Sequence, residues 1–132
     1  MRSNQTLSSF HKLVRKEFSL FYRQKAADWR GYVRCYTCGV LLRWQAADLG
    51  HFRHINALDF EPKANRVQCA KCNRYLSGNL GVFAVKLIKE IGLKEVEKLN
   101  KAHTRVFTLT ELRKIRLWIK RMRRLELKKI KR

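Results

Sequence analysis

The sequence predicts an α+β fold that is mostly helical, in which a small metal-bound centre lies between an N-terminal helix and basic C-terminal helices. Two observations support this prediction. Four cysteines occur as two Cys-x-x-Cys pairs, Cys35 with Cys38 and Cys69 with Cys72, and 30 residues separate the pairs. Five glycines and the single proline lie between residues 31 and 81, which leaves the two ends nearly free of helix breakers. We expect one domain over residues 1–132, made of an N-terminal helix (8–30), a zinc-bound core (31–80) and C-terminal helices (81–132).

The two cysteine pairs predict one structural zinc site. Zinc in structural sites takes four ligands in a tetrahedron, and a two-residue gap lets one tight turn direct two sulfurs at the same ion. Disulfides are rare in reducing compartments, so in such a compartment paired cysteines favour a metal over a cross-link. Cys35, Cys38, Cys69 and Cys72 are therefore the expected zinc ligands.

The N-terminal helix is predicted from apolar residues spaced three and four apart, beginning at Phe10 and ending at Tyr22, with Ser8 or Ser9 as its cap. The opposite face carries lysines and arginines, which either contact phosphate or keep the helix solvated. In the middle of the chain, residues 33–34, 40–44 and 50–55 are expected to be extended, with the last as the return strand of a small hairpin. A helix is expected to begin at residues 72–75 and to be interrupted at Gly78 and Gly81.

Two further helices are predicted after the centre. An apolar stripe predicts the first over residues 81–101. The second begins at a capping-box spacing, Thr108 to Glu111, and its apolar residues between Leu112 and Leu125 repeat with a period near 3.5. We expect this face to pack within its own chain, with a contact in a homodimer as the alternative.

The charge of the chain predicts a polyanionic partner. Lysine and arginine number 31 against 10 acidic residues, a formal net charge of +21. So large an excess is typical of proteins that bind nucleic acid. No run of about 18 apolar residues is present to span a membrane, and the first residues lack the apolar core of a signal peptide. We therefore expect a cytoplasmic protein that does not enter membranes.

Two residues near the cysteines have the chemistry of a nuclease. Phosphodiester hydrolysis needs a base for the attacking water and a cation for the charge that develops on phosphate. His51 has a side chain suited to the first role. Asn73, directly after Cys72, has an amide oxygen suited to a magnesium or manganese ion.

Several coupled motifs over residues 28–100 resemble the phage recombination endonuclease family NinG, also called Rap. They are the first cysteine pair, Gly50-His51-Phe52, the run from Gln68 to Arg74, and Leu76-Ser-Gly-Asn79. The resemblance implies a zinc-bound ββα-metal (treble-clef-like) core of the His-Asn-His superfamily. It also implies metal-dependent cleavage of branched DNA such as Holliday junctions and D-loops, in the bacterial host cytoplasm if the chain is phage encoded.

The same resemblance assigns residues to roles. His51 matches the general base, and Asn73 matches a metal ligand of the related phage endonuclease VII. Asn65 is the candidate for the asparagine that orients the base histidine. Many members of the superfamily carry an aspartate just before that histidine as a metal ligand, whereas this chain has Gly50. The residues that can replace that ligand are Asp48, His54, Asp59, Glu61 and Asn79.

DNA contacts are expected from basic residues after the second cysteine pair and on the last helix. These are Arg74, Arg113, Arg116, Lys120, Arg121 and Arg124.

Two other functions fit parts of the sequence. A four-cysteine zinc site with a high positive charge is also typical of a non-catalytic nucleic-acid-binding protein, which has no reason to keep His51 together with Asn73. Glu61-Pro-Lys63 matches the Glu-x-Lys pattern of restriction-type nucleases, but Pro62 argues against the central strand that this pattern requires.

Overall fold

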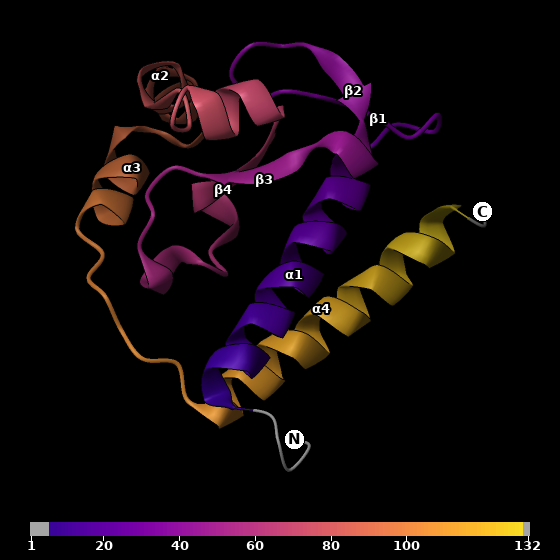
Figure 1. The fold of residues 1–132 in the computed structure, drawn as a ribbon, viewed down its shortest axis with the longest axis vertical. Coiled ribbons are helices and arrows are strands. Elements are labelled where there is room, and N and C mark those ends of the chain that lie inside the picture. The colour runs from indigo at the N-terminus through magenta and orange to yellow at the C-terminus, as the bar shows by residue number, and fades with distance from the viewer. Residues whose placement is uncertain (1–5, 131–132) are drawn as a thin grey trace.

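The computed structural model describes residues 6–130, so residues 1–5 and 131–132 of the predicted domain lie outside the described part of the chain. Two long helices, α1 (Leu7–Ala26) and α4 (Leu109–Ile130), lie side by side along one flank. The strands and the two shorter helices, α2 (Leu80–Ile91) and α3 (Leu93–Asn100), form the rest of the body (Figure 1). The predicted α+β fold with mostly helical content is confirmed.

Helix α1 differs from its prediction at both ends. Its cap is Thr6, not Ser8 or Ser9, because the Thr6 hydroxyl accepts the backbone N–H of Ser9 at 3.0 Å. It ends at Ala26 instead of residue 30, because the Asp28 carboxylate accepts the backbone N–H groups of Arg30 and Tyr32 and fixes a turn there. Short polar side chains of this kind compete with the helix for backbone hydrogen bonds.

The main core forms where α1 meets α4. Phe10, Val14, Phe18 and Phe21 from α1 are buried against Leu112 and Ile119 from α4. The predicted capping box starts α4, since the Thr108 hydroxyl accepts the Glu111 N–H and the Glu111 carboxylate accepts the Thr108 N–H, each at 3.1 Å. The expected packing of this helix within its own chain is thus confirmed.

Four short strands form two separate antiparallel pairs. β1 (Tyr32–Arg34) pairs with β2 (Leu41–Arg43) around the first cysteine pair. β3 (Asp48–His51) pairs with β4 (Asn65–Gln68), which places His51 opposite Asn65. The expected return strand over 50–55 was wrong, because the extended segment ends at His51 and its partner is β4. Strand β4 escaped prediction since its polar residues lack the usual strand composition.

After the second cysteine pair, a helical turn η4 (Lys71–Tyr75) forms as expected. Gly78 interrupts it with a φ of +92°, whereas Gly81 lies inside α2 and interrupts nothing. The single helix expected over 81–101 was also wrong, because Gly92 takes a φ of +90° and divides it into α2 and α3. These helices bury Phe83, Leu87, Val96 and Leu99 in a second core.

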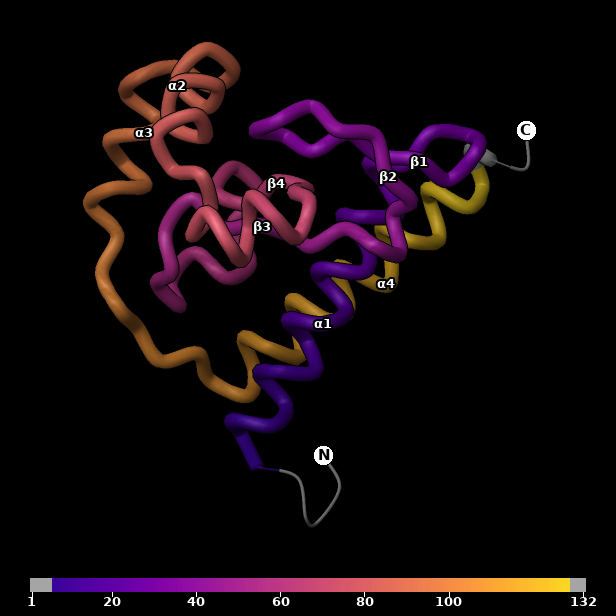
Figure 2. The backbone as a smooth tube through the Cα atoms, turned by 45° about the horizontal axis from the view of Figure 1, so that its top comes forward, coloured from indigo at the N-terminus to yellow at the C-terminus, as the bar shows by residue number. Residues whose placement is uncertain are grey.

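Figure 2 shows that the shorter helices lie on the far side of the β3–β4 pair from α1 and α4. The β3–β4 pair therefore sits between the two cores. Among the described residues, we find no helix with the length and apolar content needed to cross a membrane.

Candidate functional site

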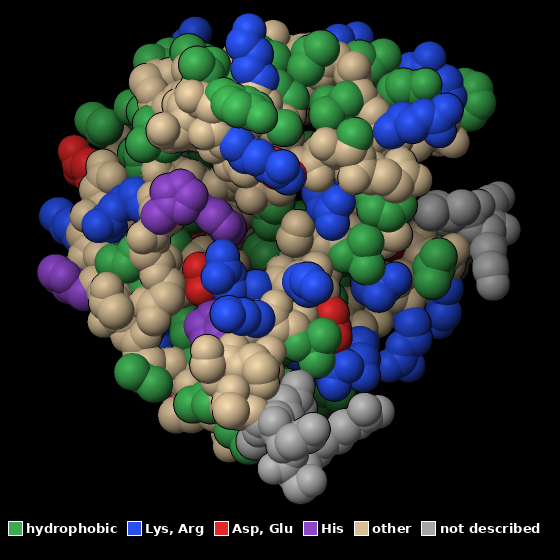
Figure 3. Space-filling model, viewed as in Figure 1, with side chains coloured by type: hydrophobic (Ala, Val, Ile, Leu, Met, Phe, Trp, Pro, Cys, Tyr) green, Lys and Arg blue, Asp and Glu red, His purple; other side chains and the backbone are tan. Residues whose placement is uncertain are grey.

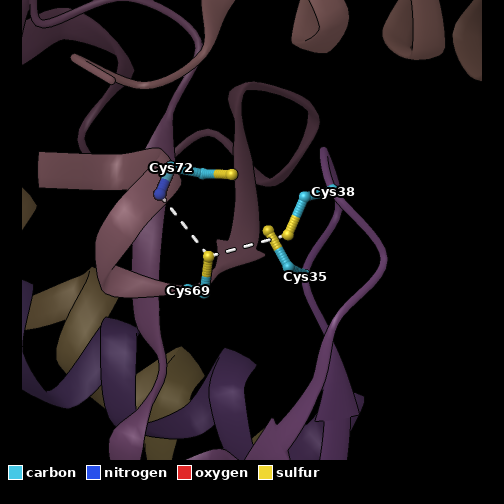
Figure 4. Close-up of side chains that lie close together, drawn as sticks. All are labelled: Cys35, Cys38, Cys69 and Cys72. Atoms are coloured by element: carbon cyan, nitrogen blue, oxygen red, sulfur yellow. Dashed lines mark hydrogen bonds between the residues drawn. The ribbon is translucent and has the colours of Figure 1, made fainter. Parts of the chain in front are cut away.

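The four cysteines converge, as Figure 4 shows. Their sulfur atoms all lie within 4.8 Å of one another, and Cys38 Sγ is 3.7 Å from Cys69 Sγ. Zinc–sulfur bonds of about 2.3 Å in a tetrahedron separate the sulfurs by about 3.8 Å. The four thiols are thus placed to hold one structural zinc ion.

The surroundings of these thiols shift their pKa values in opposite directions. Burial opposes ionisation of Cys35, but the Thr37 hydroxyl and neighbouring backbone N–H groups lower the pKa of its thiol to about 6. Burial raises the pKa of Cys69 to about 12. Because adjacent thiolates repel one another, a bound cation is what allows all four to ionise together.

Polar side chains surround the sulfur cluster. The Thr37 hydroxyl lies 3.4 Å from Cys35 Sγ, and the Asn79 amide nitrogen lies 3.7 Å from Cys72 Sγ. Asn79 takes a positive φ at the turn before α2. Its side chain therefore contacts the cysteine cluster and not His51.

His51 and Asn65 are in contact. The two face each other across the β3–β4 pair, and Asn65 Oδ1 contacts His51 Nδ1. Asn65 Nδ2 donates to the backbone carbonyls of Leu58 at 3.0 Å and Glu61 at 2.7 Å, so the amide oxygen must face His51. An acceptor at Nδ1 places the imidazole proton there and leaves the Nε2 lone pair to accept a proton.

The surroundings of His51 keep it neutral. Burial lowers its pKa below the ordinary value of 6.5, and the positive charge of Arg15 acts in the same direction against the opposing effect of Asn65. A neutral imidazole is the form that works as a base.

Asp48, Asn73 and Arg74 form a hydrogen-bonded group in the same cleft as His51. Asp48 accepts the Asn73 amide N–H at 3.0 Å and two N–H groups of Arg74, each at 2.9 Å. Burial acts to raise the pKa of Asp48, but the hydrogen bonds from Arg74 and Asn73 outweigh it and lower that pKa. Asp48 is therefore ionised and paired.

The remaining ligand candidates have other partners or positions. The exposed His54 ring lies 5.6 Å from the His51 ring. Asp59 pairs with His11 at 2.8 Å and lies 3.7 Å from Arg15. Glu61 caps a 3-10 turn by accepting the Lys63 N–H at 3.1 Å. Pro62 lies in that turn and not in a strand, so the local structure does not suit a restriction-type Glu-x-Lys site. Among described residues, the four cysteines are the one group of three or more His, Cys, Asp or Glu side chains placed to share an ion.

His51 lies in an open cleft of about 860 Å³ between α1 and the β3–η4 region. Two acidic residues, Asp48 and Asp59, line it against five basic ones, which are Lys12, Arg15, Lys16, Arg23 and Arg74. Lys and Arg side chains are numerous on the face of the molecule in Figure 3, near the histidines. The cleft is therefore suited to a polyanion.

Four of these cations come from α1, and the sequence analysis left their role open between phosphate binding and solvation. The sequence shows these basic residues on one helix face, but only the fold shows that this face borders the cleft of His51. Of the predicted DNA contacts, Arg74 lines the cleft, and Arg116 instead pairs with Glu17 at 3.0 Å. The other predicted contacts on α4, which are Arg113, Lys120, Arg121 and Arg124, are exposed and do not line it.

Gly50 is required by a close approach of Gln68. A side-chain carbon at position 50 would overlap Gln68 Oε1 and lie 2.6 Å from Gln68 Cδ. Gln68 is fully buried, and its Nε2 donates to the Thr37 hydroxyl at 3.0 Å and to the Gly78 carbonyl at 2.8 Å. An aspartate therefore has no room at position 50.

Fold and site together define a basic protein in which a four-cysteine, zinc-type centre lies beside a cleft that carries a histidine oriented by an asparagine. The chain belongs to the NinG family, whose model, described as Bacteriophage Lambda NinG protein, matches residues 2–132.

Curated relatives support this family. The chain is 33% identical to Protein ninG of Escherichia phage 933W over 109 residues, which cover 80% of this chain and 52% of that protein. It is also 33% identical to Protein ninG of Salmonella phage P22 (76% of this chain, 48% of that protein) and of Escherichia phage lambda (71% and 45%). The chain thus spans about half the length of the curated relatives it matches. No solved structure matches it.

Proposed function

We propose that this protein is a metal-dependent endodeoxyribonuclease that cleaves branched recombination intermediates, such as Holliday junctions and D-loops. The main support is the arrangement of His51, whose Nδ1 contacts Asn65 and whose Nε2 is left to accept a proton at the edge of a basic cleft. The preference for branched DNA comes from the resemblance to the NinG family and from the family match.

His51 is the general base in this mechanism. Its Nε2 accepts a proton from a water molecule as the oxygen attacks the scissile phosphorus. A base of this kind contributes about 10²–10⁴-fold in rate. Asn65 is a positioning residue, because its hydrogen bonds to Leu58 and Glu61 hold the acceptor that fixes the tautomer of His51.

The residues beside His51 have the oxygen donors that a magnesium or manganese ion prefers. Asp48 and Asn73 would hold the ion, with His54 as a further candidate ligand, and Arg74 would then release Asp48, which its exposed side chain permits. When bound, such an ion acts as a Lewis acid on the phosphate. Arg74, once released, is free to contact the phosphate backbone.

The basic cleft binds the DNA backbone in this proposal. Lys12, Arg15, Lys16 and Arg23 present positive charge along α1, so a strand at His51 would lie against this helix. The exposed cations of α4 are proposed to contact a second arm. Each phosphate contact releases counterions, so binding should weaken steeply as salt increases.

A substrate panel tests the proposal. The native chain is incubated with magnesium and a four-way junction, a linear duplex or a single strand of matched length. We expect the junction to be cut at least tenfold faster than the duplex. Equal rates would refute the branched preference, and binding without any cutting would favour a non-catalytic four-cysteine zinc protein that binds nucleic acid. Among described residues, only the four cysteines form a group of three or more His, Cys, Asp or Glu side chains placed to share an ion, and this observation keeps the second function in view.

Two further proposals accompany the nuclease. Symmetric cutting of a junction would suit a homodimer with two-fold symmetry, and its contact surface must differ from the α4 face that packs on α1. Light scattering with and without junction DNA measures the oligomeric state. We also propose that the protein acts in the cytoplasm of the bacterial host, where a reducing environment keeps its four thiols available for zinc.

A further inference from the structure

A second recess lies away from His51, between the end of α1, the turn at residues 27–31 and the last turns of α4. It has a volume of about 680 Å³, within the range of roughly 300–1,000 Å³ typical of small-ligand sites. It shares no lining residue with the His51 cleft. Its aromatic lining is Phe21, Trp29 and Trp44, and its charged lining has both signs, with Lys25 and Arg123 against Asp28 and Glu126. We call this recess the Trp29 groove.

Trp29 is almost fully solvent-exposed, and hydrogen bonds fix the backbone turn that carries it. Its exposed fraction is 93%, the largest among the exposed hydrophobic residues that the structure describes. The turn that carries it projects beside β1 (Figures 1 and 2) and is fixed by Asp28, which accepts the N–H groups of Arg30 at 2.9 Å and Tyr32 at 3.0 Å. The fixed turn therefore presents a large aromatic surface to solvent.

Aromatic rings and guanidinium groups alternate beside the groove. The Arg30 guanidinium lies 5.8 Å from the Trp29 ring and 5.5 Å from the Tyr32 ring. Arg43, which pairs with Tyr32 across β1 and β2, has its guanidinium 5.5 Å from the same Tyr32 ring. Flat π surfaces joined to positive charge match the chemistry of an unstacked base on a phosphate backbone.

The groove and the His51 cleft lie on either side of a three-residue 3-10 turn, η1 (Trp44–Ala46). Trp44 lines the groove, whereas Gln45 and Ala46 line the cleft. Arg23 marks the border, because its guanidinium lies 5.7 Å from the Trp44 ring and donates to the Trp44 and Ala47 carbonyls. Adjacent residues of one turn therefore face the two sites.

We propose that the Trp29 groove binds an unpaired nucleobase of a DNA branch, with Trp29 as the stacking surface and Arg30 and Arg123 beside the backbone. The inference rests on the proposed function in that its ligand is DNA. Fully paired duplex offers no free base face, so a site of this kind favours DNA at the point where strands separate.

Binding measurements without divalent ions test the groove separately from cleavage. The ligands are two labelled duplexes with the same single-stranded flap, one with normal bases and one with abasic sites, so that their phosphate charge is equal. For the native chain we expect about tenfold tighter binding of the flap with bases, from stacking on one or two bases. Equal affinities for the two flaps would overturn the proposal.

Matched variants show whether Trp29 causes the preference for the flap with bases. Trp29→Leu should lose the preference for bases, whereas Trp29→Phe should keep most of it, and both should melt like the native chain because Trp29 is exposed. A preference that survives in Trp29→Leu would also overturn the proposal. His51→Ala should keep the full preference. If the native chain prefers the flap with bases but cuts no DNA, the nuclease proposal fails and the proposed base site is retained. If it cuts DNA but does not prefer the flap with bases, the proposed base site fails and the nuclease proposal is retained.

Discussion

Substitution of Gly50 by alanine should destabilise the protein strongly, although Gly50 lies in a strand and does not take a positive φ. A methyl group there would overlap Gln68 Oε1. Gln68 has no space to move, because it is fully buried and its Nε2 makes hydrogen bonds to Thr37 and Gly78. Losing two buried hydrogen bonds costs about 1–1.5 kcal/mol each, and overpacking a core costs about 1–3 kcal/mol.

The sum is about 3–6 kcal/mol, a large part of the roughly 5–15 kcal/mol that stabilises an ordinary domain. Urea unfolding of the zinc-loaded protein, followed by circular dichroism, measures this change. Gly81→Ala is the matched control, since nothing lies within 4 Å of the added carbon and alanine suits the helix. We expect the control to be neutral or slightly stabilising.

A double-mutant cycle identifies the cause. In a Gln68→Ala background the added methyl group enters free space, so Gly50→Ala should then cost less than about 1 kcal/mol. A native-background cost below about 1 kcal/mol, or the same cost in both backgrounds, would refute the assignment of Gly50 to the approach of Gln68. The result also bears on the site, because it explains why this chain has no aspartate before its candidate base.

Three further predictions concern protonation and charge. Asn65→Asp places a carboxylate beside His51 and should raise the pKa of His51 by about 1–2 units. Because the neutral ring is the base, the acidic limb of the pH–rate profile for cleavage should move to higher pH. A profile that does not move would contradict the proposed contact. Folding stability should decline as pH falls below the ordinary histidine pKa of 6.5, because burial lowers the pKa of His51 and the unfolded chain binds the proton more readily. Urea titrations at several pH values measure this decline, and His51→Ala should lack the part of it that comes from His51. The double variant Lys12→Ala, Lys16→Ala should reduce the slope of log DNA affinity against log salt concentration by about 2. The control Lys94→Ala on α3 should leave this slope unchanged. Equal effects of the two variants would show that the DNA does not lie along α1.

A test of the four-cysteine centre is direct. We expect one zinc per chain by metal analysis, and removal of zinc by a strong chelator should unfold the centre because structural zinc supplies folding free energy. An unchanged melting temperature after complete removal would show that the sulfur cluster is stable without a metal.

Local signals in the sequence were sufficient for the long helices and the cysteine cluster. The capping box at Thr108 and Glu111 and the doubled Cys-x-x-Cys spacing each involve residues whose geometry is set within a few positions. The errors lie where a single residue or a distant contact decides. Gly92 ended a helix whose apolar stripe continues past it, and β4 is a strand because it pairs with β3 rather than because of its own composition.

The candidate site shows the same division. His51 and Asn73 were predicted from their chemistry beside the cysteines and Asn65 from the resemblance, and the fold brings His51 and Asn65 into contact. The position of the basic α1 face beside His51 and the role of Gln68 were not predictable, because each depends on which surfaces meet after folding. In particular, the approach of Gln68 to Gly50 requires the register of β3 with β4, which no local pattern encodes.

The most direct test of the central claim is the single-turnover cleavage of a four-way junction with magnesium by the native chain and by His51→Ala. The variant must first match the native protein in zinc content, melting temperature and junction affinity. We predict a loss of about 10²–10⁴-fold in the cleavage rate, the contribution of a general base. Cleavage by His51→Ala at the native rate would contradict the account.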